Sequence, residues 1–374
     1  MDLSSLRPLF DRPGPWASVY MDTSHNTEDA ARRHELRVRA AVAELAEQGA
    51  EKRTCEAVRR ALADVPVSGE PPARALFACD GEVVLDQPLA TAPVLPEATW
   101  APLPRLGPLV ALSDDGPSCL IAHIDRTGAR LELDDGRRRI PQGEVEGEQW
   151  PVHRTGRNEW SERHFQLKVE NTWEQNAELI AGEIAKRCQA TGARLVVLAG
   201  DPRERRLVLE HLPEQLRGLA VETGRDPSEE KIAQLRKERQ EQRLAAVLDR
   251  FRAARGRPGE HGAGGGQPGP AAEGVPAVVS AAQRRQVEAL LVQPGSPDPA
   301  RTVWIGPSPD QVAVDRKELE SLGVSRPQAA RADDALVRSA VAANAEVFAV
   351  PEDSREPAGG IGAVLRWSNE PAFA

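Results

Sequence analysis

The sequence predicts an α/β fold that is divided among three domains. Short apolar runs rich in β-branched residues alternate with longer segments whose apolar residues recur at helical spacing. A proline-rich stretch at 88–108 and a glycine-rich stretch at 256–274 interrupt this alternation. A chain of 374 residues suits two or three domains of about 100–150 residues each. We expect an N-terminal α/β domain at 1–112, a middle α/β domain at 113–257, a linker at 258–275 and a C-terminal α/β domain at 276–374.

The first domain is expected to begin with a strand and two helices. Thr27 can cap the first helix, and the second must end before Pro66. Asp80-Gly81 between two apolar runs is a typical hairpin turn. The proline-rich stretch that follows is expected to be a surface connection. The predicted elements are a strand at 16–21, helices at 27–48 and 51–63, and a hairpin at 75–86.

The middle domain contains the most regular helical pattern in the chain. From Trp173 to Cys188 the apolar residues are spaced by 4, 3, 4 and 4 positions, which places them on one helical face. A buried strand and an Asp201-Pro202 helix start follow this helix. The predicted elements are strands at 118–125 and 129–133, a helix that ends near 192, and a strand at 194–200.

Residues 228–255 predict a long charged helix with eight basic and five acidic residues. Its acids begin the helix and its arginines end it, as the helix dipole favours. A solvated face accounts for this pattern without any function. The last domain is expected to contain a helix at 276–292, a strand at 302–306, a helix at 333–345, a strand at 346–350 and a closing glycine-rich segment at 359–367.

The composition restricts the class of protein. The net charge of −9 argues against unspecific coating of nucleic acids, and no apolar run is long enough to span a membrane. The absence of a signal-peptide pattern and the wide spacing of the cysteines favour free thiols in the cytoplasm. There are 42 arginines and six lysines. An RNA-binding protein would show this bias, and so would a GC-rich genome.

No common catalytic motif is present. The chain lacks a Walker loop, HExxH, GxSxG and a three-glycine GxGxxG, so we predict no catalytic residue and no cofactor. The scattered histidines and cysteines predict no metal site. Asp125 and Asp201, at strand ends, could serve a metal-dependent RNA nuclease, but such residues more often close a turn or cap a helix.

Three motifs resemble the archaeo-eukaryotic release factor and Pelota superfamily. They are CLIAHIDRTGARLEL, LVVLAGDPRE and the closing GGIGAVLRW. The resemblance implies the three-domain α/β architecture and a structural role for the last motif. The segment WASVYMDTSHNTEDAARRHELR and the VHR start of the middle-domain loop resemble the actinobacterial group related to the ribosome hibernation factor Balon. The residues concerned in the closing motif are Gly359, Gly360, Gly362 and Arg366.

The loop that releases peptide in this superfamily corresponds to residues 151–164. That position contains no Gly-Gly-Gln, and the Gly265-Gly266-Gln267 found in the linker is interpreted as coincidence. Arginines beside an aromatic ring suit RNA contact, whereas an ordinary polar loop with a half-buried tryptophan is the alternative. The candidate rRNA-binding residues are His153, Arg154, Arg157, Trp160, Arg163 and His164.

The resemblance implies a non-catalytic protein that binds the ribosomal A site during hibernation or translational silencing under stress. Its expected partners are the 70S ribosome, through A-site rRNA, and a translational GTPase such as elongation factor Tu. The alternatives are a ribosome-rescue peptidyl-tRNA hydrolase and, more remotely, the metal-dependent RNA nuclease. The codon-reading NIKS motif is missing, which argues against stop-codon recognition.

Overall fold

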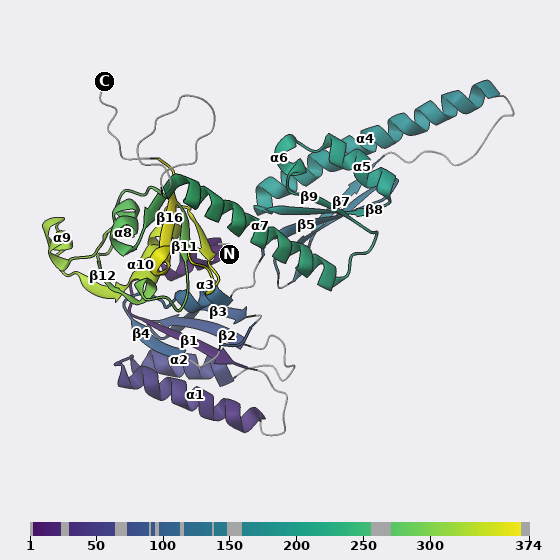
Figure 1. Cartoon of the computed structure of the whole chain (residues 1–374). Coiled ribbons are helices and arrows are strands. Elements are labelled where there is room, and N and C mark those ends of the chain that lie inside the picture. The colour runs from purple at the N-terminus through teal and green to yellow at the C-terminus, as the bar shows by residue number, and fades with distance from the viewer. Residues whose placement is uncertain are drawn as a thin grey trace, which may run out of the picture. The chain divides into compact units, whose positions relative to one another are not determined.

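The computed structural model divides the chain into two compact units, each of which is α/β as predicted (Figure 1). The terminal unit combines Leu3–Asp114 with Arg243–Ala374, and the middle unit is Asp115–Gln242. The structure describes residues 3–23, 30–63, 73–89, 91–93, 97–112, 116–136, 138–147, 159–255 and 271–367.

The N-terminal part of the terminal unit is a four-stranded antiparallel sheet in the order β3-β2-β1-β4. The first strand, both helices and the hairpin are confirmed, except that the predicted start of the first helix with its Thr27 cap lies outside the described residues. The proline-rich stretch is more structured than predicted, because its proline-free run forms an edge strand. The elements are η1 (Leu3–Leu9), β1 (Trp16–Asp22), α1 (Ala30–Glu47), α2 (Lys52–Ala63), β2 (Ala73–Cys79), β3 (Glu82–Leu89), β4 (Glu97–Ala101) and α3 (Gly107–Leu112).

Both faces of β1 are buried. Ala17, Val19 and Met21 belong to the core that α1 and α2 cover. Trp16 and Tyr20 point to the opposite face and join a second core that includes residues from the C-terminal segment. The parts predicted as separate first and last domains therefore share one hydrophobic core.

The C-terminal part of the terminal unit contains two sheets, in the orders β10-β16-β11-β15 and β13-β12-β14. Helix α10 is the most buried helix of this part, with ten of its eleven residues inside the protein. The elements are β10 (Ala271–Glu273), α8 (Val275–Gln283), β11 (Val287–Val292), η2 (Asp298–Ala300), β12 (Thr302–Ile305), β13 (Val312–Ala313), α9 (Arg316–Ser321), β14 (Gln328–Arg331), α10 (Ala332–Ala342), β15 (Glu346–Ala349), η3 (Ala358–Gly360) and β16 (Ile361–Leu365).

The helix predicted at 276–292 is wrong in its second half. Helix α8 ends at Gln283, and Arg285 takes a left-handed backbone conformation with φ of 56°. The chain then continues as β11, which pairs in parallel with β15 and antiparallel with β16. A short apolar run fits a buried strand as well as a helix, so periodicity could not separate the two.

The middle unit is a five-stranded mixed sheet in the order β7-β6-β5-β8-β9. Strands β5, β8 and β9 are parallel, and the edge strands β7 and β9 were not predicted. The regular face of α4 is confirmed from Ala177 to Cys188, which pack on Leu120 and Val196. The elements are β5 (Cys119–Ile124), β6 (Gly128–Asp134), β7 (Arg139–Glu146), α4 (Glu159–Thr191), β8 (Leu195–Gly200), α5 (Pro202–His211), α6 (Glu214–Arg217) and β9 (Ala220–Thr223).

Helix α7 (Glu229–Arg255) contributes to the cores of both units. Ile232 and Leu235 pack on β5 and β8 in the middle unit, whereas Val247 and Phe251 pack with Phe348 in the terminal unit. The predicted boundary at 257 therefore lies beyond the change of unit. The solvated-face interpretation is incomplete for the second half of α7, because four of its arginines also pair with acids of the terminal unit, although Arg252 and Arg255 remain about half exposed. The pairs are Arg243–Glu346, Arg250–Glu288, Arg252–Glu356 and Arg255–Glu273.

The four cysteines are buried and free, as predicted. Burial raises the pKa of the Cys119 thiol to about 12 and that of Cys188 to about 11, so both are neutral at physiological pH. None of the helices described has the length and apolar character that a membrane span requires.

Candidate functional site

The predicted rRNA-binding loop lies mostly outside the described residues. His153, Arg154 and Arg157 are among those not described, as is the Gly-Gly-Gln at 265–267. Trp160, Arg163 and His164 belong to the first turns of α4, where the structure describes the helical backbone. The prediction about their side chains stays a prediction.

The described chain before this loop ends at Gly147, beside the turn between β5 and β6. The Gly147 amide donates to the Thr127 carbonyl at 2.7 Å. A Cβ at Gly147 would collide with Asn176 of α4, whose amide nitrogen donates to the Arg126 carbonyl at 3.3 Å. Glycine therefore allows the chain to pass close to α4 at this point.

The carboxyl ends of the three parallel strands meet at the same edge of the middle sheet. Ile124 of β5 is in register with Gly200 of β8, and Ala199 with Thr223 of β9. The residues that follow these strands therefore lie close together. They include Arg126 after β5, Arg203 after β8 and Arg225 after β9.

Trp173 of α4 lies beneath two of these arginines. The guanidinium carbon of Arg203 is 4.6 Å from the centre of the indole ring, and that of Arg126 is 5.9 Å from it. Both distances are in the range of cation–π contacts. The sequence predicted Trp173 as part of the apolar helix face, but it is only half-buried because arginines cover it.

Two of these three arginines, Arg126 and Arg225, meet carboxylates at long distances. Arg126 Nε is 3.4 Å from Glu204 Oε1, and Arg225 Nη2 is 3.7 Å from Asp201 Oδ2. The side chains of Arg126 and Arg225 are 74% and 75% exposed, compared with 18% for Glu204 and 41% for Asp201. We name the surface that contains Arg126, Arg203, Arg225 and Trp173 the arginine edge.

Asp125 and Asp201 have the structural roles that were preferred for them. Asp125 Oδ1 accepts from the Thr127 amide and hydroxyl, both at 2.7 Å, and from the Gly128 amide at 2.9 Å. Partial burial acts to raise the pKa of Asp125, but these hydrogen bonds outweigh it and lower the pKa. Asp201 caps α5 by accepting from the Arg203 amide at 3.2 Å. These two residues therefore give no support to the hypothesis of a metal-dependent RNA nuclease.

The closing motif forms part of the central sheet of the C-terminal segment. Gly359 and Gly360 have φ of 75° and 93°, and a Cβ at either would collide with Asp298 or Ser296. A Cβ at Gly362 would lie 3.0 Å from the Phe251 ring. Arg366 donates through Nη2 to the Ala343 carbonyl at 2.8 Å. These contacts lie within the fold of the C-terminal segment, and the structural role that the resemblance implies for the motif stays a prediction.

A buried polar cluster in the terminal unit was not anticipated from the sequence. Arg105 Nη1 is 2.7 Å from Asp333 Oδ2 and 3.3 Å from Asp334 Oδ1, and its Nε is 3.1 Å from Glu97. Arg331 Nε also pairs with Asp333, at 3.2 Å. The only signal in the sequence was two adjacent aspartates, Asp333 and Asp334, at the start of a segment that is otherwise apolar as far as Val337.

Three carboxylates face two guanidinium groups in this cluster, so protonation of one carboxyl is favoured. Burial, reinforced by the charge of Asp333, raises the pKa of Asp334 to about 7, although Arg105 and the Leu106 amide oppose this. Burial also raises the pKa of Tyr20, whose hydroxyl donates to the Arg105 carbonyl at 2.5 Å.

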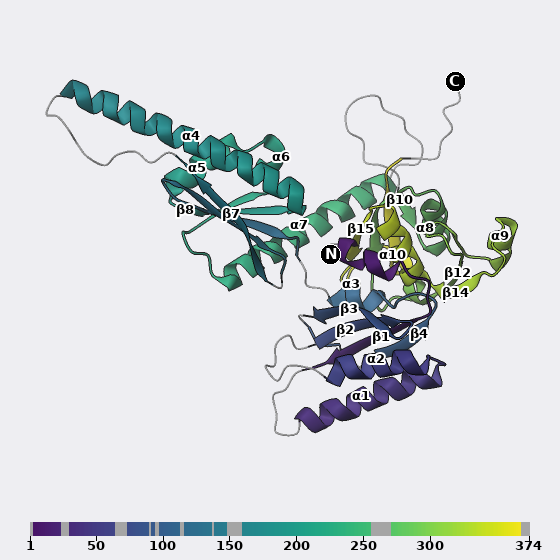
Figure 2. The same cartoon turned by 180° about the vertical axis from the view of Figure 1, so that it is seen from behind.

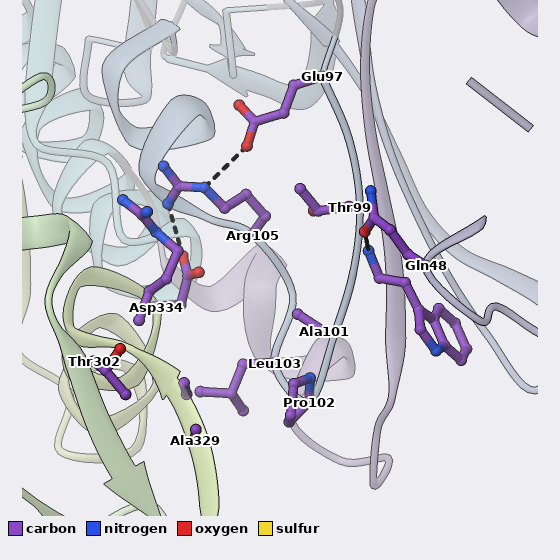
Figure 3. A pocket seen from close by; sticks show the side chains of 13 residues that line it. Gln48, Glu97, Thr99, Ala101, Pro102, Leu103, Arg105, Thr302, Ala329 and Asp334 are labelled. Carbon is purple, nitrogen blue, oxygen red and sulfur yellow. Dashed lines mark hydrogen bonds and ion pairs between the residues drawn. The ribbon is translucent and has the colours of Figure 1, made fainter. Parts of the chain in front are cut away.

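A pocket of about 360 Å³ adjoins the cluster and lies between β4 and β14. Figure 3 shows Arg105 between Glu97 and Asp334 on its wall. The side chain of Gln48 covers the outer edge of β4 beside the pocket. Its Nε2 donates to the Ala98 carbonyl at 2.9 Å, and its Oε1 accepts from the Trp100 amide at 2.7 Å.

The middle unit thus defines an α/β domain with one long helix and an exposed arginine edge. Residues 118–257, which include the whole sheet of this unit and all of α7, match the family model of bacterial archaeo-eukaryotic release factor family 2. The resemblance stated from the sequence is therefore confirmed for this segment.

Two relatives match nearly the whole chain. They are the uncharacterized proteins Rv2629 and MT2704 of Mycobacterium tuberculosis strains H37Rv and CDC 1551. Each is 29% identical to this chain and covers 97% of it, and the chain covers 96% of each relative.

Solved structures of translation factors also align with the chain. The archaeal translation termination factor aRF1 is 17% identical over 98% of this chain and 97% of its own, with a TM-score of 0.25. A chain of ribosome-bound archaeal Pelota and ABCE1 is 13% identical over 98% and 94%, with a TM-score of 0.34. Dom34 of S. cerevisiae is 11% identical over 80% and 74%, with a TM-score of 0.36.

Proposed function

We propose that this chain is a release factor-like protein that occupies the ribosomal A site without hydrolysing peptidyl-tRNA. The observation that carries the proposal is the family match over residues 118–257, in a segment whose residues 151–164 contain no Gly-Gly-Gln. Ester hydrolysis at that position needs glycines that allow close backbone approach and a glutamine that positions water. A protein that lacks these residues can occupy the ribosomal A site without hydrolysing the peptidyl-tRNA ester.

We further propose that the protein acts in the cytoplasm, in ribosome hibernation or in translational silencing under stress. We assign it to the actinobacterial group related to Balon. The N-terminal and VHR motifs support this group, and both whole-length relatives come from an actinobacterium. The C-terminal segment would engage a translational GTPase such as elongation factor Tu, as the resemblance implies.

Co-sedimentation with 70S ribosomes tests the binding step. The protein should pellet with vacant or idle ribosomes at low salt, and binding should weaken as salt rises because arginine–phosphate contacts release counterions. Failure to pellet with either ribosomal state at low salt would contradict the proposal.

Peptide release from ribosomes loaded with peptidyl-tRNA separates the silent binder from the rescue hydrolase. The wild-type protein should release no more peptide than buffer does. Gln267→Ala should leave ribosome binding and release unchanged, because that glutamine belongs to the predicted linker. Release by the wild type would favour the rescue hydrolase, and loss of release in Gln267→Ala would identify the linker motif as its active loop.

A further inference from the structure

The arginine edge brings three guanidinium groups to one exposed surface from distant positions in the sequence. Arg126, Arg203 and Arg225 follow three different strands, and the parallel register of β5, β8 and β9 places them at one edge. Two ion pairs connect their loops to α5, Arg126 to Glu204 and Arg225 to Asp201. The cluster therefore belongs to the fold of the sheet and does not depend on one flexible segment.

Trp173 holds two of the guanidinium groups near its ring before any ligand binds. Arg203 is held at 4.6 Å over the indole and Arg126 at 5.9 Å. An arginine that is already stacked loses less side-chain entropy when it forms a bidentate hydrogen bond to phosphate. The Arg126 backbone is fixed as well, through its hydrogen bond from Asn176.

The neighbouring carboxylates do not cancel the outward charge. Glu204 is 18% exposed and Asp201 41%, whereas Arg126 and Arg225 are more than 70% exposed. Burial raises the pKa of Glu204, and the charge of Asp201 adds to that effect. The Arg225–Asp201 pair is exposed on both sides, and such pairs contribute about 0–1 kcal/mol, so a phosphate can replace Asp201 as the partner of Arg225 at little cost. Arg126 is exposed enough to bind a phosphate while it stays near Glu204.

The arginine edge lies at the base of the projecting part of α4. Figures 1 and 2 show the N-terminal half of α4 extending beyond the sheet. Trp173 is fourteen residues after Glu159, where α4 begins, which corresponds to about 20 Å of helix. Gly147, from which the predicted RNA loop departs, is bonded to Thr127 next to Arg126.

We infer that the arginine edge is a second RNA contact that binds phosphate groups about 20 Å from the start of α4. The inference rests on the proposed function, from which it follows that the RNA is rRNA. The middle unit would then bind rRNA through two separate contacts, one at the predicted loop and one at the arginine edge.

The test compares two triple variants of the full chain in ribosome co-sedimentation and in hydroxyl-radical footprinting of rRNA. The first variant, Arg126→Gln, Arg203→Gln and Arg225→Gln, removes the edge. The matched control is Arg138→Gln, Arg194→Gln and Arg217→Gln. It removes the same charge from exposed arginines in the β6–β7 turn and before β8 and β9, at the opposite edge of the sheet.

The edge variant should bind ribosomes about tenfold more weakly or worse, and the slope of log affinity against log salt should fall by about two to three. It should also lose a defined rRNA protection that the control retains. If the edge variant folds poorly, the single substitution Arg225→Gln, at a side chain that is 75% exposed, should still lower the slope by about one.

The outcomes separate this inference from the proposed function. If the wild type binds ribosomes and both triple variants bind equally well, the arginine edge is not an RNA contact and the proposed function stands. If the wild type does not bind ribosomes, the proposed function fails. A fluorescein-labelled RNA hairpin then tests the edge directly, and equal anisotropy of the wild type and the edge variant would overturn the inference too.

Discussion

Arg105 and Asp333 form an ion pair of 2.7 Å although 228 positions separate them in the sequence. The Asp333 side chain is buried, with 2% exposure, and the Arg105 side chain is mostly buried, with 14%. The pair connects the residues just after β4 to the first turn of α10, and so joins the two segments of the terminal unit. The free energy of unfolding of the terminal unit should therefore depend on this ion pair as well as on apolar packing.

Arg105→Ala should destabilise the terminal unit by about 3–5 kcal/mol, because it leaves two buried aspartates without their shared cation. Chemical denaturation followed by tryptophan fluorescence measures this loss. Arg39→Ala is the control, since its helical pair with Glu35 is exposed and contributes about 0.3–0.5 kcal/mol. A loss below about 1 kcal/mol for Arg105→Ala would show that the cluster is solvated.

The pKa of about 7 at Asp334 predicts a stability that increases on acidification. The unfolded carboxyl has a pKa of about 3.9, so between about pH 4 and 7 the folded state holds a proton that the unfolded state has lost. This contribution is complete below about pH 4 and is lost as the pH rises through 7. Its steepest slope is about 1.4 kcal/mol per pH unit.

The measurement is the melting temperature of wild type and Asp334→Asn from pH 5 to 8.5. The variant should show a flatter profile than the wild type and should be the more stable of the two at pH 8.5. Asp249→Asn, at an exposed position, is the control and should follow the wild type. Parallel profiles for wild type and Asp334→Asn would mean that Asp334 is already ionised throughout this range.

Gln48→Ala should cost about 1–2 kcal/mol and promote self-association. The substitution removes two hydrogen bonds to β4 and leaves the Ala98 carbonyl and the Trp100 amide available at a sheet edge. Denaturation and light scattering measure the two effects. Gln48→Glu is the informative comparison, because it can still accept from Trp100 but cannot donate to Ala98. Unchanged stability and a monomeric Gln48→Ala protein would show that water replaces the side chain without loss.

The loop at 151–164 should contribute measurably to ribosome affinity. Arg154→Ala, Arg157→Ala and Trp160→Ala together remove two charges and one stacking surface. Stacking of a base contributes about 1–3 kcal/mol and a charge-assisted hydrogen bond about 1.5–3 kcal/mol. The triple variant should therefore bind at least about tenfold more weakly, since tenfold corresponds to about 1.4 kcal/mol.

The same triple variant should melt close to the wild type. A drop of many degrees would place Trp160 in a hydrophobic core and support the alternative of an ordinary polar loop. Unchanged affinity in a well-folded variant would make the loop a passive connection, and binding would then depend on other surfaces such as the arginine edge.

The predictions from sequence succeeded where a periodic pattern and a local signal agreed. The face from Ala177 to Cys188 is buried as expected, and Asp201 caps α5. The pattern failed at 276–292, where an apolar run supports a helix and a strand equally well. No local signal shows that Arg105 will meet Asp333, or that Arg203 will stack on Trp173, because strand register and α10 bring these pairs together.

The shared core of the terminal unit has a consequence for synthesis of the chain. Trp16, Tyr20 and Phe77 belong to the same hydrophobic core as residues that follow the whole middle unit, such as Val278 and Ile361. At about 5–20 residues per second, the ribosome needs on the order of ten seconds or more to extend the chain that far. During that interval the inner face of the first sheet has no native cover, so nascent chains of this protein should be good clients for chaperones that act at the exit tunnel.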